Sequence, residues 1–442
     1  NSFTGLPLVE FPLGYPAMLW LLHVVSGLSV ETLAPVMNMF LFAGLLFLSN
    51  RLLLSMNLPF LLRALILACL SCSPALLEVY SMLWSETLFL FLSVLFFVLL
   101  NGYFKRPVLL RLAVAALTCS LAMVTRYAGV TLLAVGVFFL FFDPDTTLRR
   151  KASRLFLWVV LSSSLLLLNL LRNQYYLHQL TGVRERSLHG LSEIIREMGD
   201  SLSDWLPFLH GHPNTATVVW IVLLVTAAIL LIKRILQPQY LPSPDSLLLA
   251  TGLFYAGFML LAAWVSRFEY LTSRLLSPLY IPLFIAVPAI CYQWARQKTK
   301  PIRNMMWLVL LCWFLGLQLQ YYRLNAEAWE GIKDAGIPGY SEDSWTRLPL
   351  VQYLQAHPLT GTVYANAPDA AWYLCGIRSK PLPHKDLPAE LGQLLQVPKF
   401  ALVWFTDGDN PDLVSFDYLC AHARLLSMKR IEGGWIAQFQ KK

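Results

Sequence analysis

The sequence carries little charge. Only 14% of its 442 residues are Asp, Glu, Lys or Arg, whereas 57% are hydrophobic, and the mean hydropathy is +0.57. Soluble domains carry about 25% charged residues, so this composition excludes an ordinary soluble protein and indicates a polytopic membrane protein. The net charge of +8 comes from short basic clusters between apolar runs, which is typical of membrane topology and argues against nucleic-acid binding.

The sequence also lacks the motifs of several enzyme classes. It contains no GxxxxGK[ST] loop, no paired CxxC and no HExxH, so nucleotide hydrolysis and standard zinc sites have no support. His210 and His212, in "HGH", are solvated loop residues in the plainest interpretation and a metal-binding pair in the alternative. No secretory signal pattern opens the chain at Asn1.

Cysteine is scarce, and most of it lies in apolar runs, where it acts as a small hydrophobic residue. Cys375 and Cys420 are exceptions, because they lie in the polar C-terminal part. A disulfide between them is one alternative if that part is extracytoplasmic, and two free thiols are the other.

Long apolar runs recur through the first three quarters of the chain. A spanning helix needs about 20 mainly apolar residues, and ten runs approach that length. They cover 33–50, 60–78, 86–103, 108–125, 128–142, 153–171, 215–232, 246–265, 277–295 and 304–320. The second contains Pro74 and the fifth is short, so we expect both to be tilted or broken.

Lys and Arg alternate from loop to loop, which predicts the orientation. The basic clusters lie near 51–63, 105–111, 149–154, 233–234 and 296–303, and these loops are predicted to be cytoplasmic. The loops around 78–86, 126–127 and 267–274 are then outside, together with Asn1 and the chain after Tyr321. An N-terminus outside the cell must have been carried across, so we expect a further transmembrane helix upstream of Asn1.

Two amphipathic helices are predicted at the outer surface. Residues 15–26 are too short to span and precede Gly27, which favours an interfacial helix. In the loop 173–215, apolar residues recur at helical spacing between Leu191 and Leu202, which predicts a second helix.

The composition becomes that of a soluble domain after about residue 323. We therefore predict a transmembrane domain over 1–322 and a small extracytoplasmic α/β domain over 323–442. Helices are expected at 344–355, 368–376, 386–396 and 413–423, with strands at "GTVYAN", "FALVWF" and a closing hairpin of "LLSMKRI" and "GWIAQF". The fold class is thus a polytopic α-helical membrane protein with a C-terminal α/β domain.

Two acids stand at predicted outer helix starts. Glu10 precedes Pro12 and a helix, and it is either an exposed loop acid or a carboxylate held by a stiff loop, suited to a divalent cation or to activating an acceptor. Glu86 follows Ser85 at the start of an apolar helix. It either complements the helix dipole or faces a polar cavity with a partner.

Two arginines stand at the same predicted level. Arg126 ends the fourth run and Arg274 precedes the ninth. Each guanidinium either reaches lipid headgroups or holds a phosphate, whose oxygens match its forked donors.

Four motifs, in this order, carry a resemblance. They are "FTGLPLVEFPLGYPAMLWLLHVVSG", "WSETLFLFLSVLFF", "LAMVTRYAGVTLL" and "SRLLSPLYIPLFI". Together they resemble GT-C membrane glycosyltransferases, closest to bacterial members of glycosyltransferase family 39, which includes protein O-mannosyltransferases and has the lipid A aminoarabinose transferase as a relative. "VYANAPDAAWYLCGIRSKPLP" looks like the extracytoplasmic tail of some bacterial members.

The resemblance implies a function in the bacterial inner membrane. Such enzymes move a sugar from a polyprenyl-phosphate donor to a lipid, protein or glycan acceptor on the outer face, with inversion at the anomeric carbon. By motif, Glu10 and Glu86 are expected as catalytic acids, with Glu10 also a possible ligand of a divalent metal ion. Substrate binding is expected at five positions: Arg126, Tyr127, Arg274, Tyr15 and Glu269.

The sequence departs from the family at three points. Phe11 stands where some relatives carry Lys, and Leu13 stands where many carry a second Pro, so this chain has no lysine at that position to bind a phosphate. The family's principal catalytic Asp would lie upstream of Asn1, in keeping with the expected upstream helix. The alternative function is a lipid or polysaccharide transporter without catalytic activity. Repeated halves would favour a transporter, and the sequence shows none.

Overall fold

The computed structural model describes residues 9, 11–144, 147–182, 186–187, 189–237, 241–267, 270–406 and 410–442. These residues form two compact units, a helical unit over 9–325 and a second unit over 326–442. Glu10 and Glu269 lie outside the described residues.

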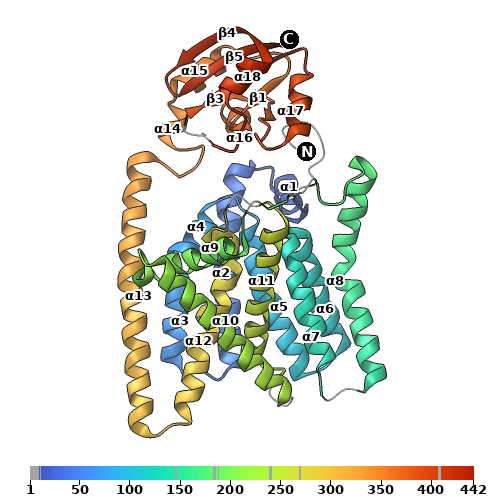
Figure 1. The fold of residues 1–442 in the computed structure, drawn as a ribbon. Coiled ribbons are helices and arrows are strands. Elements are labelled where there is room, and N and C mark those ends of the chain that lie inside the picture. Colours follow the sequence, from blue (N-terminus) through green and yellow to red (C-terminus); the bar gives the residue numbers. More distant parts are fainter. Residues whose placement is uncertain are drawn as a thin grey trace. The chain divides into compact units, whose positions relative to one another are not determined.

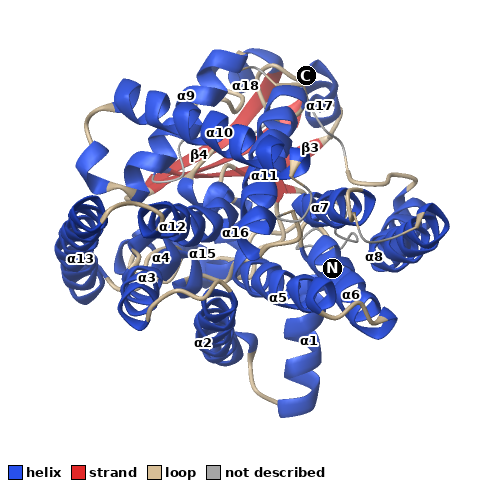
Figure 2. Cartoon of the chain, turned by 90° about the horizontal axis from the view of Figure 1, so that it is seen from below, coloured by secondary structure: helices blue, strands red, loops and turns tan. Residues whose placement is uncertain are grey.

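The helical unit is a bundle of helices that run largely side by side (Figures 1 and 2). Its elements are α1 (Gly14–Ser26), α2 (Val30–Ser55), α3 (Phe60–Cys72), α4 (Pro74–Ser81), α5 (Glu86–Lys105), α6 (Leu109–Thr125), η1 (Tyr127–Gly129), α7 (Val130–Phe141), α8 (Leu148–Leu177), α9 (Leu191–Trp205), η2 (Pro207–Leu209), α10 (Pro213–Leu236), α11 (Pro244–Val265) and α12 (Ser273–Arg296), followed by α13 (Lys300–Ala335).

Each of the ten apolar runs forms helix. Among the described residues, seven helices are long and apolar enough to cross a membrane, and α3 with α4 makes an eighth span if the pair is counted as one. The helices α6 and α7 are shorter apolar helices. The expected break in the second run is confirmed: α3 and α4 meet at a bend of 48°, because Pro74 cannot donate a backbone hydrogen bond and Ser73 leaves the helical conformation.

The basic loops gather at one end of the bundle. The connections α2–α3, α5–α6, α7–α8, α10–α11 and α12–α13 all lie at the lower end in Figure 1. Two arginines there pair with acids: Arg234 Nη2 lies 2.5 Å from Asp245 Oδ2, and Arg154 Nη1 lies 3.5 Å from Asp143 Oδ2. Alternate loops therefore share one end, as the charge pattern requires.

The opposite end carries α1, α4 and α9 (Figure 1). The helix α1 ends at Gly27, whose φ of 72° suits a residue without a Cβ, and its Trp20 and Val25 are exposed. The helix α9 presents Ile194, Met198 and the following buried residues to the bundle. Both predicted amphipathic helices therefore form.

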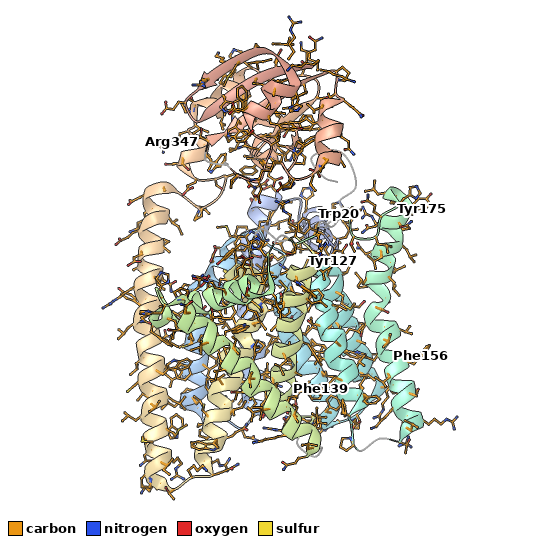
Figure 3. The ribbon with its side chains drawn as sticks, in the orientation of Figure 1. Trp20, Tyr127, Phe139, Phe156, Tyr175 and Arg347 are labelled. Atoms are coloured by element: carbon orange, nitrogen blue, oxygen red, sulfur yellow. The ribbon has the colours of Figure 1, made fainter. Side chains whose placement is uncertain are left out.

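Aromatic side chains mark the inside and the outside of the bundle. Phe139 is buried in the core, whereas Phe156 and Tyr175 point outward from α8 (Figure 3). Trp158 is fully buried, and its ring lies directly against Gly136 of α7, where a larger residue would collide with it. This close approach locks α8 onto α7.

The second unit contains a five-stranded sheet in the order β2-β1-β3-β5-β4. Its elements are α14 (Asp343–Thr346), α15 (Pro349–Ala356), β1 (Val363–Ala365), α16 (Pro368–Cys375), β2 (Lys380–Pro381), α17 (Pro388–Leu395), β3 (Lys399–Phe405), α18 (Phe416–His422), β4 (Ala423–Ile431) and β5 (Gly434–Lys441). The strand β1 is parallel to β2 and β3, and β3, β5 and β4 are antiparallel.

Alternation along β3 gives the sheet two buried faces. Val403 packs with α15 and α16 on one face, and Leu402 packs with α17 and α18 on the other. Cys375 lies on the first face and Cys420 on the second, and both thiols are free. The sheet between them prevents the disulfide that the sequence left open.

The predicted elements of this unit form, with one correction. The helix expected over 344–355 is two helices, α14 and α15, because Pro349 starts a new helix and Leu348 is extended, with φ −61° and ψ 125°. The short strand β2 was not predicted from the sequence. Its two residues are too few to show alternation.

Candidate functional site

Glu86 lies at the centre of an ion-paired cluster at the α1–α4–α9 end of the bundle. Its Oε1 accepts a hydrogen bond from Nε of Arg274 at 2.6 Å and forms an ion pair with Nη1 of Arg126. The hydroxyl of Ser85 donates to the other carboxylate oxygen at 3.3 Å. Three of the residues that the sequence singled out are therefore in direct contact, although 188 positions separate Glu86 from Arg274.

The backbone brings these side chains together because each lies at a helix end. Glu86 is the first residue of α5. Arg126 follows α6 in an extended conformation, with φ −146° and ψ 136°, and separates α6 from η1. Arg274 lies in the first turn of α12. The start of α5, the end of α6 and the start of α12 thus meet at one level of the bundle.

Burial separates the roles of the three residues. The side chain of Glu86 is 0% exposed and that of Arg126 is 15% exposed, whereas Arg274 is 39% exposed. The guanidinium carbon of Arg274 also lies 4.1 Å from the ring centroid of Trp84, a cation–π contact that helps to hold the group in place. Within this trio two guanidiniums face one carboxylate, and Arg274 is the part that a ligand can reach.

The helix α9 fixes the segment that leads into Arg274. The Glu197 carboxylate accepts a hydrogen bond from the backbone N–H of Leu271 at 3.0 Å, and Ser201 donates to the Leu271 carbonyl at 3.0 Å. Trp205 donates to the Ser273 hydroxyl at 2.6 Å. These contacts hold the backbone N–H and carbonyl of Leu271 and the side chain of Ser273, the first residue of α12, so α9 fixes the position of the chain just before Arg274.

Sequence reasoning missed these positioning residues. Glu197, Ser201 and Trp205 recur every four positions on the buried side of α9, among the apolar residues that predicted the helix. A buried polar stripe of this kind requires partners on a neighbouring segment, and that was the signal available in the sequence.

The two tyrosines expected at the site lie at the same end of the unit. Burial raises the pKa of Tyr15 to about 12, the interaction with Thr87 opposes the rise, and the Glu86 carboxylate adds to it. The hydroxyl of Tyr127 donates to the Val9 carbonyl at 3.2 Å, and Figure 3 shows Tyr127 near the level of α1. Tyr15 therefore adjoins the ion-paired cluster, and Tyr127 holds the chain that enters α1.

Two further carboxylates are exposed at this end of the bundle, and one of them interacts with Arg274. Glu78 at the end of α4 is exposed and interacts electrostatically with Asp204 of α9 and with Arg274. Burial raises the pKa of Asp204, His210 opposes the rise, and Asp200 adds to it. Neither acid was singled out from the sequence, because each is an ordinary polar residue at a helix end until the fold places Glu78 near Arg274 and Asp204 near Glu78.

The expected metal ion stays a prediction. No group of three or more His, Cys, Asp or Glu side chains able to hold a metal occurs in the described part of the chain. Both oxygens of Glu86 are already engaged, and His210 instead neighbours Asp204. A metal role for Glu10, which lies outside the described residues, stays a prediction.

Two apolar grooves run along the helical unit. One, of about 640 Å³, lies between α1, α5, α6 and α8, and its lining includes Thr125, the residue before Arg126. The other, of about 180 Å³, lies between α10, α11 and α12. Both are lined almost entirely by aliphatic and aromatic side chains, which suits the chains of lipids.

Solved structures resemble this chain over nearly its whole length. ArnT from Cupriavidus metallidurans bound to undecaprenyl phosphate matches with a TM-score of 0.54 and 11% identity, over 98% of this chain and 89% of ArnT. The same protein in the apo state matches with a TM-score of 0.54 and 12% identity, over 98% and 88%. The chain has the fold of ArnT.

The GT-C fold expected from the four motifs is therefore confirmed. The polytopic helical class with a small C-terminal α/β unit is confirmed as well. No protein family model and no curated protein matches the sequence. At 11–12% identity the ArnT match establishes the fold alone.

Proposed function

We propose that this protein is a membrane glycosyltransferase of the GT-C type that uses a polyprenyl-phosphate-linked sugar as donor. The observation that carries the proposal is the partly exposed guanidinium of Arg274, held over Trp84 and oriented by Glu86, in a chain with the fold of ArnT. One of the ArnT structures is bound to undecaprenyl phosphate, which supports a lipid phosphate as the ligand.

Arg274 is proposed to hold the donor phosphate. A guanidinium offers forked donors to phosphate oxygens, and Arg274 is the more exposed of the two guanidiniums of the cluster. Glu86 takes one donor of Arg274, its Nε, and the side chain of Arg274 is still 39% exposed. The apolar groove between α10, α11 and α12 gives the prenyl chain a place among the helices.

The reaction we propose is a single displacement with inversion. The acceptor oxygen forms a bond to the anomeric carbon while the bond from that carbon to the phosphate oxygen breaks, and the polyprenyl phosphate leaves with the electron pair. A carboxylate takes the acceptor proton. Arg274, and Arg126 behind it, stabilise the negative charge that develops on the departing phosphate.

The geometry favours a positioning role for Glu86 rather than the role of base. Its side chain is 0% exposed and its carboxylate is engaged by two guanidiniums, so an acceptor hydroxyl has no access to it. Glu78 and Asp204 are exposed carboxylates at this end of the bundle, and Glu78 interacts electrostatically with Arg274. Glu10 is the third proposed carboxylate, as base or metal ligand, and Glu269 a proposed substrate contact. We propose that this end of the bundle faces the extracytoplasmic side.

The test is transfer of a radiolabelled sugar from polyprenyl-phosphate donors by the purified full chain in proteoliposomes. We expect transfer by the wild-type chain and a large loss in Arg274→Ala. Arg323→Ala, at an exposed arginine of α13, is the matched control and should retain activity. Glu10→Gln, Glu78→Gln and Asp204→Asn separate the three candidate bases. Full activity in Arg274→Ala would contradict the phosphate assignment, and lipid movement without glycosidic bond formation would favour the transporter.

A further inference from the structure

The groove between α1, α5, α6 and α8 contains a polar position that the proposed reaction does not use. Its walls are aliphatic and aromatic, except near one end, where Asn169 and Arg172 of α8 join Thr125 in the lining. Leu21, Leu121 and Leu168 of the lining are 55%, 46% and 62% exposed. The groove is therefore open along its side, where a bilayer would surround it.

Asn169 is buried without a hydrogen-bond partner. It is 5% exposed, and neither its amide nitrogen nor its amide oxygen has a partner within the described chain. A buried primary amide without partners costs free energy, and in a membrane no bulk water offsets that cost. The next asparagine of α8 differs, because Asn173 donates to the Leu180 carbonyl at 2.8 Å and accepts from Arg172 at 3.1 Å.

The position along α8 matches the level of lipid headgroups. Arg154 lies in the basic end of the helix, and Arg172 is 18 residues further, or about 27 Å along the axis at 1.5 Å per residue. The hydrocarbon core of a bilayer is about 30 Å thick. Asn169 and Arg172 therefore lie where the chain of a lipid ends and its headgroup begins.

We propose that the groove binds a phosphoglycerolipid whose headgroup carries a free hydroxyl beside its phosphate. An acyl chain lies against α5 and α6, the phosphate contacts Arg172, and the hydroxyl both donates to the Asn169 oxygen and accepts from its nitrogen. A polyprenyl phosphate offers oxygens to Arg172 but no neutral hydroxyl to satisfy both amide atoms. This site is independent of the proposed sugar transfer.

The test compares lipids on the purified full chain after delipidation. Phosphatidylglycerol, phosphatidylethanolamine and a polyprenyl phosphate are titrated while the melting temperature and the bound lipid, by native mass spectrometry, are recorded. We expect wild-type protein to retain phosphatidylglycerol in preference to the others. Asn169→Leu should bind it about tenfold more weakly, since two hydrogen bonds are lost, and Arg172→Gln should lose the preference for anionic lipid.

The stability of lipid-free Asn169→Leu separates a ligand position from a structural one. We expect its melting temperature to equal or exceed that of the wild type, because an unpartnered amide is removed, whereas Asn173→Leu should melt lower because its partners are lost. Equal binding of phosphatidylethanolamine and phosphatidylglycerol would overturn the proposal, as would unchanged phosphatidylglycerol binding in Asn169→Leu. Preferential binding of the polyprenyl phosphate, weakened by Asn169→Leu, would assign the groove to the donor instead.

Discussion

Neutralising Glu86 should destabilise the bundle and misplace Arg274. In Glu86→Gln the side chain keeps its shape and one acceptor oxygen, but the buried charge that pairs with Arg126 and Arg274 is gone. Arg274 is 39% exposed and can be rehydrated, whereas Arg126 is 15% exposed and keeps an uncompensated charge. Most of the cost therefore comes from Arg126.

The magnitude follows from the two pairs. Hydrogen bonds to charged groups contribute about 1.5–3 kcal/mol each and are roughly twice as strong as neutral ones, so Glu86→Gln should cost about 2–3 kcal/mol. Removing one partner of a buried ion pair costs about 3–5 kcal/mol, which we expect for Glu86→Ala. In a thermal unfolding assay in detergent, Glu86→Gln should lower the melting temperature by about 3–6 °C.

The control is Glu31→Gln, at an exposed acid in the first turn of α2, which should change stability by less than about 0.5 kcal/mol. A double-mutant cycle with Arg126→Gln adds a second check, because the two changes should cost less together than the sum of each alone. Equal melting temperatures for Glu86→Gln and Glu31→Gln, or strict additivity with Arg126→Gln, would refute the reasoning.

Kinetics separates positioning from catalysis at Glu86. If Glu86 orients Arg274, Glu86→Gln should raise the KM for the lipid donor while part of kcat survives, and the loss of stability should accompany it. A base would behave differently: kcat would fall by more than about a hundredfold at an unchanged melting temperature.

Three other predictions follow from the site. Arg274→Ala should lower kcat/KM by about 10- to 100-fold in the transfer assay, with Arg274→Lys intermediate because a single ammonium replaces the fork; equal rates for all three proteins would contradict this. Gly199→Val should destabilise the folded protein by about 1–3 kcal/mol, because a Cβ at this position would lie 2.7 Å from the Thr217 Cα. An unchanged melting temperature in thermal unfolding would contradict this close contact between α9 and α10. Folding raises the pKa of Asp204 above 3.8, so the folded state binds the proton more tightly than the unfolded chain, and this contribution to stability is lost as pH rises through the raised pKa. The melting temperature measured against pH should therefore lose part of its slope in Asp204→Asn, and a slope identical to that of the wild type would contradict the prediction.

Much of the fold was predictable because local sequence decides it in a membrane. Long apolar runs must form helices to satisfy their backbone groups, and Pro74 breaks the second run wherever the helices pack. The continuous apolar run that predicted β3 arises because this strand is packed on both faces. The single helix predicted over 344–355 was wrong because the prediction followed the amphipathic pattern. It gave too little weight to Pro349, which disfavours a helical conformation at Leu348.

The candidate site was predictable only in part. Residue type and position at helix ends singled out Glu86, Arg126 and Arg274, and the family motifs pointed to the same positions. Their mutual contact was beyond the sequence, since three helices distant in the chain supply one residue each. The polar contacts of α9 with the Leu271 backbone depend equally on packing.

The sequence by itself determined that this chain is a helical membrane protein whose alternate, basic loops lie at one end, since hydrophobic length and charge act locally. Only the tertiary structure decided that Glu86 is sealed between two arginines while Arg274 stays reachable, and that Asn169 lacks a partner. Burial and pairing are properties of neighbours in space, and the chain acquires those neighbours only when its helices pack.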